Sequence, residues 1–369
     1  MAVVDCVFTG DLILDEPDPD HWLGGIAPAV GAADVAVGHL EVPHTDRCDE
    51  SGDDVPAPAA PAAHLAALSR AGFAAVTLAG NHIADCGARG IEDTCVGLDR
   101  LGIAACGAGA DIVAARRPAL LTRHGLRLGI LSYNCVGPES GWATAGRAGC
   151  AFVRVVTANE VPITPADDAG SADPRSIAAM QEDIAAVSVR SDIVVVALHK
   201  GIVHTPARLA NYEAPIAHAA VDAGADVVVG HHAHIVRGIE FYRDKPIFHG
   251  LGNGCVVTRA LSGGGGNARR AEWAQRRKRR FGFEPDPAYS LAPFHPEAVH
   301  SMLARVRVHR DGRLEAGFSP VWVDPPGRPR IAEGAQAAEV AAYIARITAT
   351  AGLAPLVLHA DSGGIWVRQ

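Results

Sequence analysis

The chain has 369 residues, 49% of them hydrophobic, and a formal net charge of −8, which suits one large or two smaller α/β domains and argues against general affinity for nucleic acid. No apolar run of about eighteen residues occurs, so no membrane-spanning segment is predicted. The first residues lack a basic stretch followed by a long apolar one, so we expect no secretion signal and a cytoplasmic protein that contacts neither nucleic acid nor membrane.

Residue patterning predicts strands and helices that alternate along the chain. Strands are expected at 3–8, 34–37, 74–78, 127–133, 192–198 and 227–229, and helices at 62–71, 87–101 and 207–223. In the helix at 87–101, Ile91, Cys95 and Leu98 recur at the i, i+4, i+7 spacing of one helical face. Such alternation predicts α/β layers in which helices cover a largely buried sheet.

Two stretches interrupt this alternation. Residues 136–174 are rich in Gly, Ala, Pro and Asp and are expected to form a long functional loop. Residues 259–300 begin with a flexible run of glycines and continue into a basic run, which is either a solvated helix face or a clamp for an anionic group to which Arg276 and Arg277 contribute. We therefore expect a catalytic domain at 1–325 with these two insertions, followed by a packed helix and tail at 326–369.

The eight cysteines are scattered without the C-x-x-C spacing of a redox or zinc motif. Several lie within apolar segments, as small core residues do. In a reducing compartment they are expected to remain thiols. We assign none of them to a metal site or to nucleophilic catalysis.

Residues that can ligate a metal follow the expected strands at their carboxyl ends. The apolar run at 227–229 leads into Gly230-His231-His232-Ala233-His234. Because alternate residues of an extended chain point the same way, His232 and His234 can converge on one ion. Other strand ends supply Asp11, Glu41, Asn81, His82 and His199. Each could be an ordinary turn or cap residue, but ligands of α/β sheets bind beyond the carboxyl ends of strands, so the set predicts a metal site.

The order Gly10-Asp11, Glu41, Gly80-Asn81-His82, His199 and Gly230-x-His232-x-His234 resembles the calcineurin-like metallophosphatase superfamily, and within it the CapA family of poly-γ-glutamate capsule synthesis. Residues 3–257 carry the similarity, including the Asn81-His82-x-x-Asp85-x-Gly87 motif. The resemblance implies a four-layer αββα sandwich with metal at its strand ends. The ligands that it implies are Glu41, Asn81, His199, His232 and His234.

The chain departs from the family pattern in ways that bear on its chemistry. Metallophosphatases open with Asp-x-His, whereas Ile13 stands two residues after Asp11, so one nitrogen ligand is absent from that motif. Losing nitrogen while keeping oxygen favours Ca²⁺ or Mn²⁺, with Zn²⁺ as the alternative, and no organic cofactor is expected. Family members commonly have tryptophan after the histidine that corresponds to His199, whereas Lys200 stands here as a candidate substrate-binding residue.

Without the N-terminal anchor of the capsule proteins, the chain is also similar to the peptide epimerases of lasso-peptide biosynthesis. That resemblance implies inversion at the Cα of a C-terminal tryptophan, with a ribosomal precursor peptide as partner. Inversion needs an acid and a base with pKa values near neutrality, and a cation for the enolate charge. The candidate catalytic groups are His82 with Asp85, and His295 oriented by Asp11 if the 259–300 segment folds over the pocket.

The alternative is a metallophosphoesterase or another metallo-hydrolase that uses a metal-activated water. In that interpretation His82 donates a proton to the leaving group, and the other histidines of the strand ends hold the metal. A peptide-binding protein with a relict metal site is a third, non-catalytic interpretation. A homo-oligomer is compatible with all three.

Overall fold

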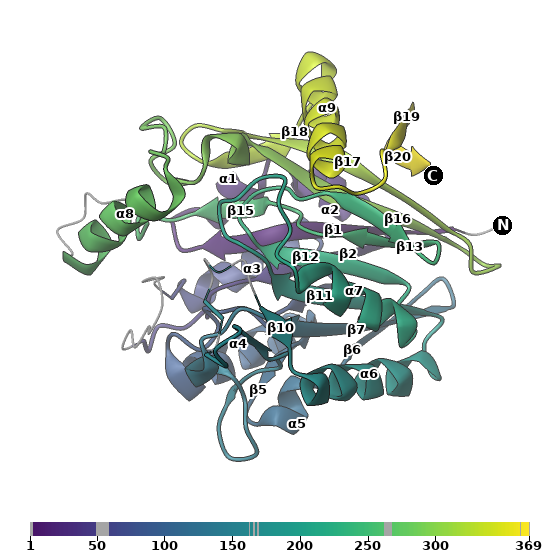
Figure 1. Ribbon diagram of the computed structural model, residues 1–369, viewed down its shortest axis with the longest axis horizontal. Coiled ribbons are helices and arrows are strands. Elements are labelled where there is room, and N and C mark those ends of the chain that lie inside the picture. The colour runs from purple at the N-terminus through teal and green to yellow at the C-terminus, as the bar shows by residue number, and fades with distance from the viewer. Residues whose placement is uncertain are drawn as a thin grey trace.

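Strands and helices alternate along most of the chain in the computed structural model, as the sequence predicts (Figure 1). The structure describes residues 3–48, 59–161, 163–164, 167, 170–261, 268–361 and 363–368. The helices are α1 (Pro19–Leu23), α2 (Ala27–Gly31), α3 (Leu65–Ala71), α4 (Gly87–Arg100), α5 (Ile112–Ala115), α6 (Pro174–Ser188), α7 (Glu213–Asp222), α8 (Ala268–Phe281) and α9 (Gly334–Thr350). The strands are β1 (Val3–Leu14), β2 (Val35–Leu40), β3 (Ala75–Thr77), β4 (Ala104–Cys106), β5 (Ala108–Gly109), β6 (Ala119–Arg123), β7 (Leu126–Asn134), β8 (Gly149–Cys150), β9 (Val155–Val156), β10 (Ser171–Ala172), β11 (Ile193–Lys200), β12 (Val227–His232), β13 (Ile239–Tyr242), β14 (Lys245–Phe248), β15 (Asn253–Val257), β16 (His300–His309), β17 (Leu314–Asp324), β18 (Arg328–Ile331), β19 (Val357–Asp361) and β20 (Gly364–Arg368).

The strands form two large sheets. The larger has the order β19-β20-β17-β16-β1-β2-β3-β4, with β15 also beside β1 and β18 beside β17. The smaller has the order β13-β14-β12-β11-β7-β6. Its central strand β11 is buried along its length and apolar from Ile193 to Leu198, as expected of a parallel strand covered on both faces. In β1 the side chains alternate between two cores, because successive residues of a strand point to opposite faces.

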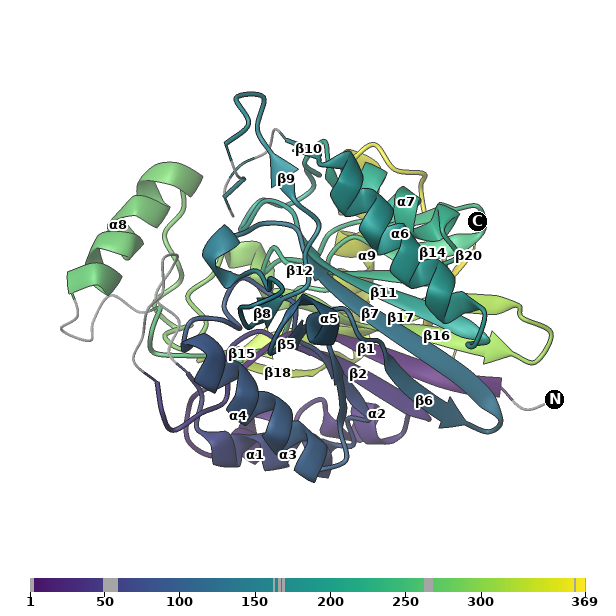
Figure 2. The same cartoon turned by 90° about the horizontal axis from the view of Figure 1, so that it is seen from below.

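Helices cover the outer faces of the two sheets, and Figure 2 shows the resulting layers with α1 to α4 on one side and α6 and α7 on the other. Phe8 and Val37 of the larger sheet share one core with Val195 and Val229 of the smaller sheet, so the two sheets face each other. The architecture is therefore a four-layer αββα sandwich, and the predicted fold class is confirmed.

The C-terminal segment is part of this sandwich. On α9, Val340, Tyr343, Ile344 and Ile347 enter the core between the sheets. Beyond the expected helix, residues 326–369 contribute three strands, since β18 and β20 pair with β17 and β19 pairs with β20. None of the helices in the described ranges is long and apolar enough to cross a bilayer.

The two stretches that interrupt the pattern contain ordered elements. The described part of 136–174 holds β8, β9, β10 and a 3₁₀ turn at Glu139–Gly141, so it is less of an open loop than its composition predicts. The 259–300 segment provides α8 and a 3₁₀ turn at Pro296–Val299. Both β1 and α8 reach the same side of the molecule, where β1 ends (Figure 1).

Candidate active site at the strand ends

Carboxyl ends of parallel strands from both sheets meet at the site. In the larger sheet, Asp11 of β1 lies opposite His39 of β2. In the smaller sheet, His199 of β11 lies opposite His231 of β12. The predicted convergence of strand-end residues is therefore explained by strand register.

The segment at 249–253 runs between these two strand ends and holds them by backbone contacts. Asp11 N–H donates to the Gly252 carbonyl at 3.2 Å, and Leu251 N–H donates to the Gly230 carbonyl at 3.0 Å. A Cβ on Gly10 would lie 1.9 Å from the Gly252 oxygen, and one on Gly230 would lie 2.1 Å from a carbonyl oxygen of the same segment. Only glycine fits such a close approach of backbone to backbone at either position.

One imidazole lies between two carboxylates at the centre of the site. His234 Nε2 is 3.4 Å from Glu41 Oε1, and His234 Nδ1 is 3.7 Å from Asp11 Oδ2. Burial opposes the charge on His234, but the two carboxylates outweigh it and raise its pKa to about 9. Burial and the neighbouring Glu41 charge raise the pKa of Asp11 well above its usual range, whereas the charge of His234 overcomes burial and lowers the pKa of Glu41 to about 2.

A row of buried imidazoles adjoins these carboxylates. The ring centroids of His39 lie 4.4 Å from His231 and 4.8 Å from His199, and His199 lies 4.8 Å from His232. Burial, followed by the charges of neighbouring imidazoles, lowers the pKa values of His39 and His199 well below the usual range. Neutral imidazoles are the form of histidine that ligates metals.

The arrangement fits a divalent metal ion. Two groups, Asp11–His39–His199 and Asp11–Glu41–His234, each place their potential ligand atoms within 4.8 Å of one another. Among the residues that the structure describes, His39 Nε2, His199 Nδ1 and Glu41 Oε2 are buried without a hydrogen-bond partner. A buried polar atom without a partner costs about 1–3 kcal/mol, which a ligand would offset. Asp11, Glu41, His39, His199 and His234 are therefore the residues that would hold an ion, which would take the place of the proton on His234.

Of the predicted ligands, Glu41, His199 and His234 belong to this donor set. Asn81 and His232 lie beside it, because Asn81 Oδ1 accepts from His199 Nε2 at 2.7 Å and His232 Nδ1 is 3.2 Å from the same nitrogen. His39 was missed, although it stands two residues before Glu41 and such alternation is the signal that singled out His232 and His234. His39 thus brings an imidazole nitrogen near Asp11, although Ile13 stands where metallophosphatases have a histidine. Ile13 itself is buried in a small apolar cluster.

The predicted His82–Asp85 couple is present at the edge of the site. His82 Nδ1 is 2.8 Å from Asp85 Oδ2, and both side chains are buried. Asn81 Nδ2 lies 3.1 Å from His82 Nε2 and connects the couple to His199 through its other atom. A carboxylate on Nδ1 fixes the tautomer and orientation of the ring, as acid–base chemistry requires.

A disulfide bond flanks this couple, so the prediction that the cysteines are thiols is wrong for two of the eight. Cys48 and Cys86 are bonded, with their Cα atoms 4.9 Å apart. They are 38 residues apart in sequence, and only the fold brings the segment after Glu41 beside the loop that ends in Asp85. The remaining cysteines are free: Cys6, Cys95, Cys106, Cys135, Cys150 and Cys255.

Aromatic side chains cover His234 on its outer side. Phe294 stacks on His234 with ring centroids 4.6 Å apart, so the 259–300 segment does fold over the pocket. His204, which the sequence analysis missed because it lies in an irregular loop, is 6.2 Å from His234 and 5.3 Å from both Phe281 and Phe283. We call these residues (His204, Phe281, Phe283 and Phe294) the aromatic lid.

His295 follows the aromatic lid directly in sequence. Its ring lies 5.0 Å from Phe283, and its Nδ1 accepts from the Glu297 N–H at 3.1 Å. Its described contacts do not include Asp11, which is reached instead through Phe294 and His234. Half-burial lowers the pKa of His295.

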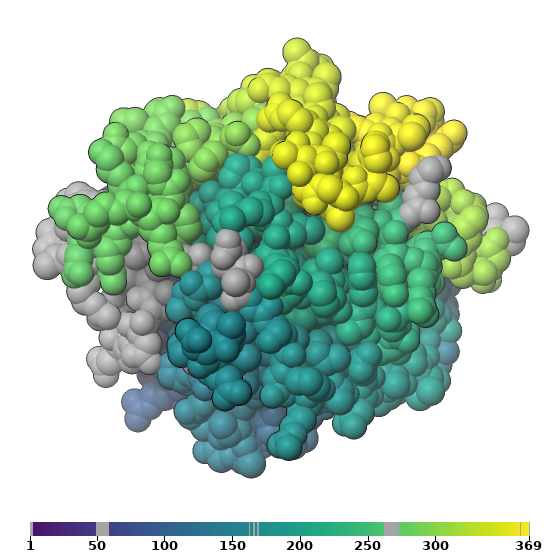
Figure 3. Space-filling view, viewed as in Figure 1, coloured from purple at the N-terminus to yellow at the C-terminus, as the bar shows by residue number. Residues whose placement is uncertain are grey.

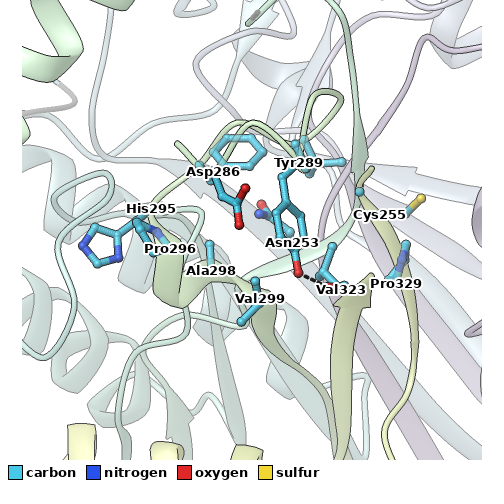
Figure 4. A pocket seen from close by; sticks show the side chains of 14 residues that line it. Asn253, Cys255, Asp286, Tyr289, His295, Pro296, Ala298, Val299, Val323 and Pro329 are labelled. Carbon is cyan, nitrogen blue, oxygen red and sulfur yellow. Dashed lines mark hydrogen bonds between the residues drawn. The ribbon is translucent and has the colours of Figure 1, made fainter. Parts of the chain in front are cut away.

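A cavity of about 160 Å³ opens beside the site. Asn253 links the two, since its Oδ1 is 2.9 Å from His234 Nδ1 and its side chain also lines the cavity. Figure 4 shows the Asp286 carboxylate and Tyr289 near Asn253, while the His295 ring points away from the cavity. The Tyr289 hydroxyl donates to the Val323 carbonyl at 3.1 Å.

Two of the three predicted substrate-binding residues are buried and engaged elsewhere. Lys200 Nζ donates to Glu213 Oε2 at 2.9 Å, and neither side chain is exposed. Its position is a correction to the prediction: as the neighbour of His199 on a strand, Lys200 points to the opposite face of the sheet. Arg277 is buried and donates to the Pro293 carbonyl at 2.6 Å, which attaches α8 to the lid, whereas Arg276 is exposed.

The fold and this cluster define the class: a four-layer α/β protein with buried histidines and carboxylates at its strand ends. Residues 5–256 match the family described as "Bacterial capsule synthesis protein PGA_cap". The match covers more than half of the chain, and the chain belongs to this family. The predicted resemblance to the CapA family is thereby confirmed.

Individual curated relatives match about half of the chain. A probable polyglutamine synthesis accessory protein of Mycobacterium tuberculosis is 36% identical over 205 residues, which are 54% of this chain and 47% of that protein. The capsule biosynthesis protein CapA of Bacillus anthracis is 28% identical over 188 residues, 51% of this chain and 41% of that protein. The chain thus spans about half the length of these curated relatives. The calcineurin-like phosphoesterase YfkN from Bacillus subtilis aligns with a TM-score of 0.40 and 11% identity, over 94% of this chain and 97% of that one.

Proposed function

We propose that this protein is a metal-dependent peptide epimerase that inverts the Cα of the C-terminal residue, a tryptophan, of a ribosomal precursor peptide. The observation that carries the proposal is the placement, in one buried site, of the carboxylate-held imidazole of His82 beside donors that fit a divalent ion. A histidine whose ring is fixed by a carboxylate is suited to acid–base chemistry, which proton abstraction at Cα demands.

In this proposal, particular residues of the chain have separate chemical roles. His82 keeps the Nδ1 proton toward Asp85, so its Nε2 is the atom that takes or returns a proton. His295, from the segment that covers the site, is the second proton-exchanging group of the proposal, and the Asp11 carboxylate lies beside His234 at the centre of the site. A bound divalent ion would supply electrostatic stabilisation for the charge that develops on the substrate carboxylate. The aromatic lid excludes water from the reacting atoms.

Deuterium incorporation tests this proposal. The protein is incubated in D₂O with a short peptide that ends in tryptophan, after chelation and after addition of Ca²⁺ or Mn²⁺. We expect deuterium at the terminal Cα of the free-acid peptide, dependent on the metal, and none in the C-terminally amidated peptide. Absence of deuterium with every metal would contradict the epimerase, and incorporation that survives chelation would remove the metal from the proposal.

A metallophosphoesterase is the second candidate. It is favoured by one observation: Asp11 belongs to both ligand groups, as a carboxylate that bridges two ions would. Hydrolysis of an aryl phosphate that is lost in His199→Ala would support this alternative. Lack of turnover across a panel of phosphate esters would argue against it.

A further inference from the structure

The strongest charge segregation in the chain lies in α8. This helix carries seven basic residues and one acidic residue. Removing them from the 33 basic and 41 acidic residues of the whole chain leaves 26 and 40, a formal net charge of −14 for the remainder. A cationic helix on an otherwise acidic protein is an electrostatic site for an anionic partner.

Helical spacing separates the cations of α8 into two faces. Arg277 and Phe281 stand at i and i+4 and both face inward, where Arg277 reaches the Pro293 carbonyl and Phe281 joins the aromatic lid. Arg276, Arg279 and Arg280 stand at i, i+3 and i+4 and are exposed. We call these three residues the basic face of α8. Figure 3 shows α8 protruding at the edge of the molecule.

Charges within the basic face are only partly balanced. Arg280 pairs with Asp167 at 3.1 Å. Arg276 and Arg279 form no ion pair with any residue in the described part of the chain. Like charges at this spacing destabilise a helix on its own, so an anion on this face would relieve a repulsion.

The C-terminal end of α8, which carries the basic face on its exposed side, lies close to the candidate active site. Phe281, the last residue of α8, contacts His204, which in turn lies beside His234. We propose that the basic face of α8 binds an acidic segment of the peptide whose C-terminal residue occupies the site. This inference rests on the proposed function in one respect, namely that the site receives the end of a peptide.

The dimensions and charges favour a short acidic peptide segment. At about 1.5 Å per residue, a helix of this length spans roughly 21 Å, which matches about six residues of extended chain. A nucleic acid long enough to leave the helix would meet a surface of net negative charge. A peptide segment confined to α8 meets only the cations.

Binding is measured by fluorescence anisotropy, independently of epimerisation. The probes are a labelled peptide with a run of glutamates before a C-terminal tryptophan, and its counterpart with glutamine in place of each glutamate. The test variant is Arg276→Gln/Arg279→Gln. The matched control is Arg123→Gln/Arg190→Gln, which removes the same charge from exposed positions outside α8.

We expect the glutamate peptide to bind the unmodified protein more tightly than the glutamine peptide. The test variant should weaken binding of the glutamate peptide by about fivefold and leave the glutamine peptide unaffected. Raising the salt concentration from about 50 to about 200 mM should reduce this preference. The control variant should behave as the unmodified protein.

Equal affinity for the two peptides, or an equal loss in the control variant, would overturn the inference. Tighter binding of a single-stranded oligonucleotide than of the glutamate peptide would overturn it in favour of a nucleic-acid partner. Retained binding without deuterium incorporation contradicts the proposed function alone. Incorporation without a preference for glutamate contradicts this inference alone.

Discussion

Two buried polar clusters lie back to back in this protein, and they differ in how their atoms are paired. At the strand ends, Glu41, His39 and His199 leave several buried atoms without hydrogen-bond partners among the described residues. Behind them, Glu213 is saturated: its Oε2 accepts from Lys200 at 2.9 Å, and its Oε1 accepts from the Ala210 N–H at 2.6 Å and lies 3.2 Å from Arg237. We call this second cluster the Glu213 network.

The difference separates a site from a scaffold. The Glu213 network holds the loop that follows His199, since Arg237 also donates to the Ile202 carbonyl at 3.1 Å. That loop carries His204 of the aromatic lid. The saturated Glu213 carboxylate therefore helps to fix the backbone, and the atoms of Glu41, His39 and His199 without partners are left for a ligand.

The largest expected effect is on catalysis. Asp11→Asn keeps the shape of the side chain but removes the carboxylate that belongs to both ligand groups, so deuterium incorporation should fall by about 10²–10⁴-fold. Its stability should not fall, because the variant removes one of two adjacent buried carboxylates. Urea unfolding measures this, with the exposed Asp99→Asn as control. Activity within a few-fold of the unmodified protein would show that Asp11 is not a catalytic residue.

The largest expected effect on stability lies in the Glu213 network. Glu213→Gln leaves Lys200 and Arg237 as buried charges without a carboxylate, and should lower the free energy of unfolding by about 3–5 kcal/mol. The matched variant in the site, Glu41→Gln, should lower it by less, because Asp11 remains beside His234 and keeps that imidazole paired with a carboxylate. Equal losses in the two variants would remove the distinction between site and scaffold.

The disulfide bond between Cys48 and Cys86 lies next to the site and should stabilise the fold covalently. Replacing both cysteines, Cys48→Ser/Cys86→Ser, should lower the unfolding free energy by about 2–4 kcal/mol, since the bond closes a loop of 38 residues. Dithiothreitol should have the same effect on the unmodified protein and none on the variant. Cys95→Ser serves as the control, and a reductant-insensitive protein would contradict the disulfide.

The smallest expected effect concerns pH. Burial raises the pKa of Glu213, but Lys200 and Arg237 outweigh it and lower the pKa to about 2, below the usual value of 4.5. The contribution of Glu213 to stability is therefore complete above about pH 4.5 and is lost as pH falls toward 2. Between about pH 7 and pH 3 it should decrease by about 2 kcal/mol. In urea titrations, the Glu213→Gln variant should not show this pH-dependent loss of unfolding free energy. The same pH profile in the variant and in the unmodified protein would contradict the prediction.

Sequence predicted those parts of the site that follow from local pattern. His199 and His234 were predicted because they follow apolar runs, and polar residues after such runs mark the ends of buried strands. The same alternation rule, applied to His39 and Glu41, would have added the missed imidazole. Applied to Lys200, it would have placed the ammonium on the far side of the sheet.

The remaining features depend on contacts between distant segments. Cys48 and Cys86 pair only because two loops from neighbouring strands lie side by side. His204 belongs to an irregular loop whose course is fixed by the Glu213 network, and no local period reveals that. The three C-terminal strands likewise depend on an available sheet edge, which composition does not show.

The segment at 249–253, which touches Gly10 and Gly230 through backbone atoms, acts as a spacer of fixed thickness between the two sheets. Main-chain contacts therefore set the width of the pocket, and the side chains that would ligate a metal take no part in them. Side chains at positions such as 11, 39 and 41 can change identity while the distance across the pocket stays constant. The chemistry of the site can therefore diverge without a change in its frame.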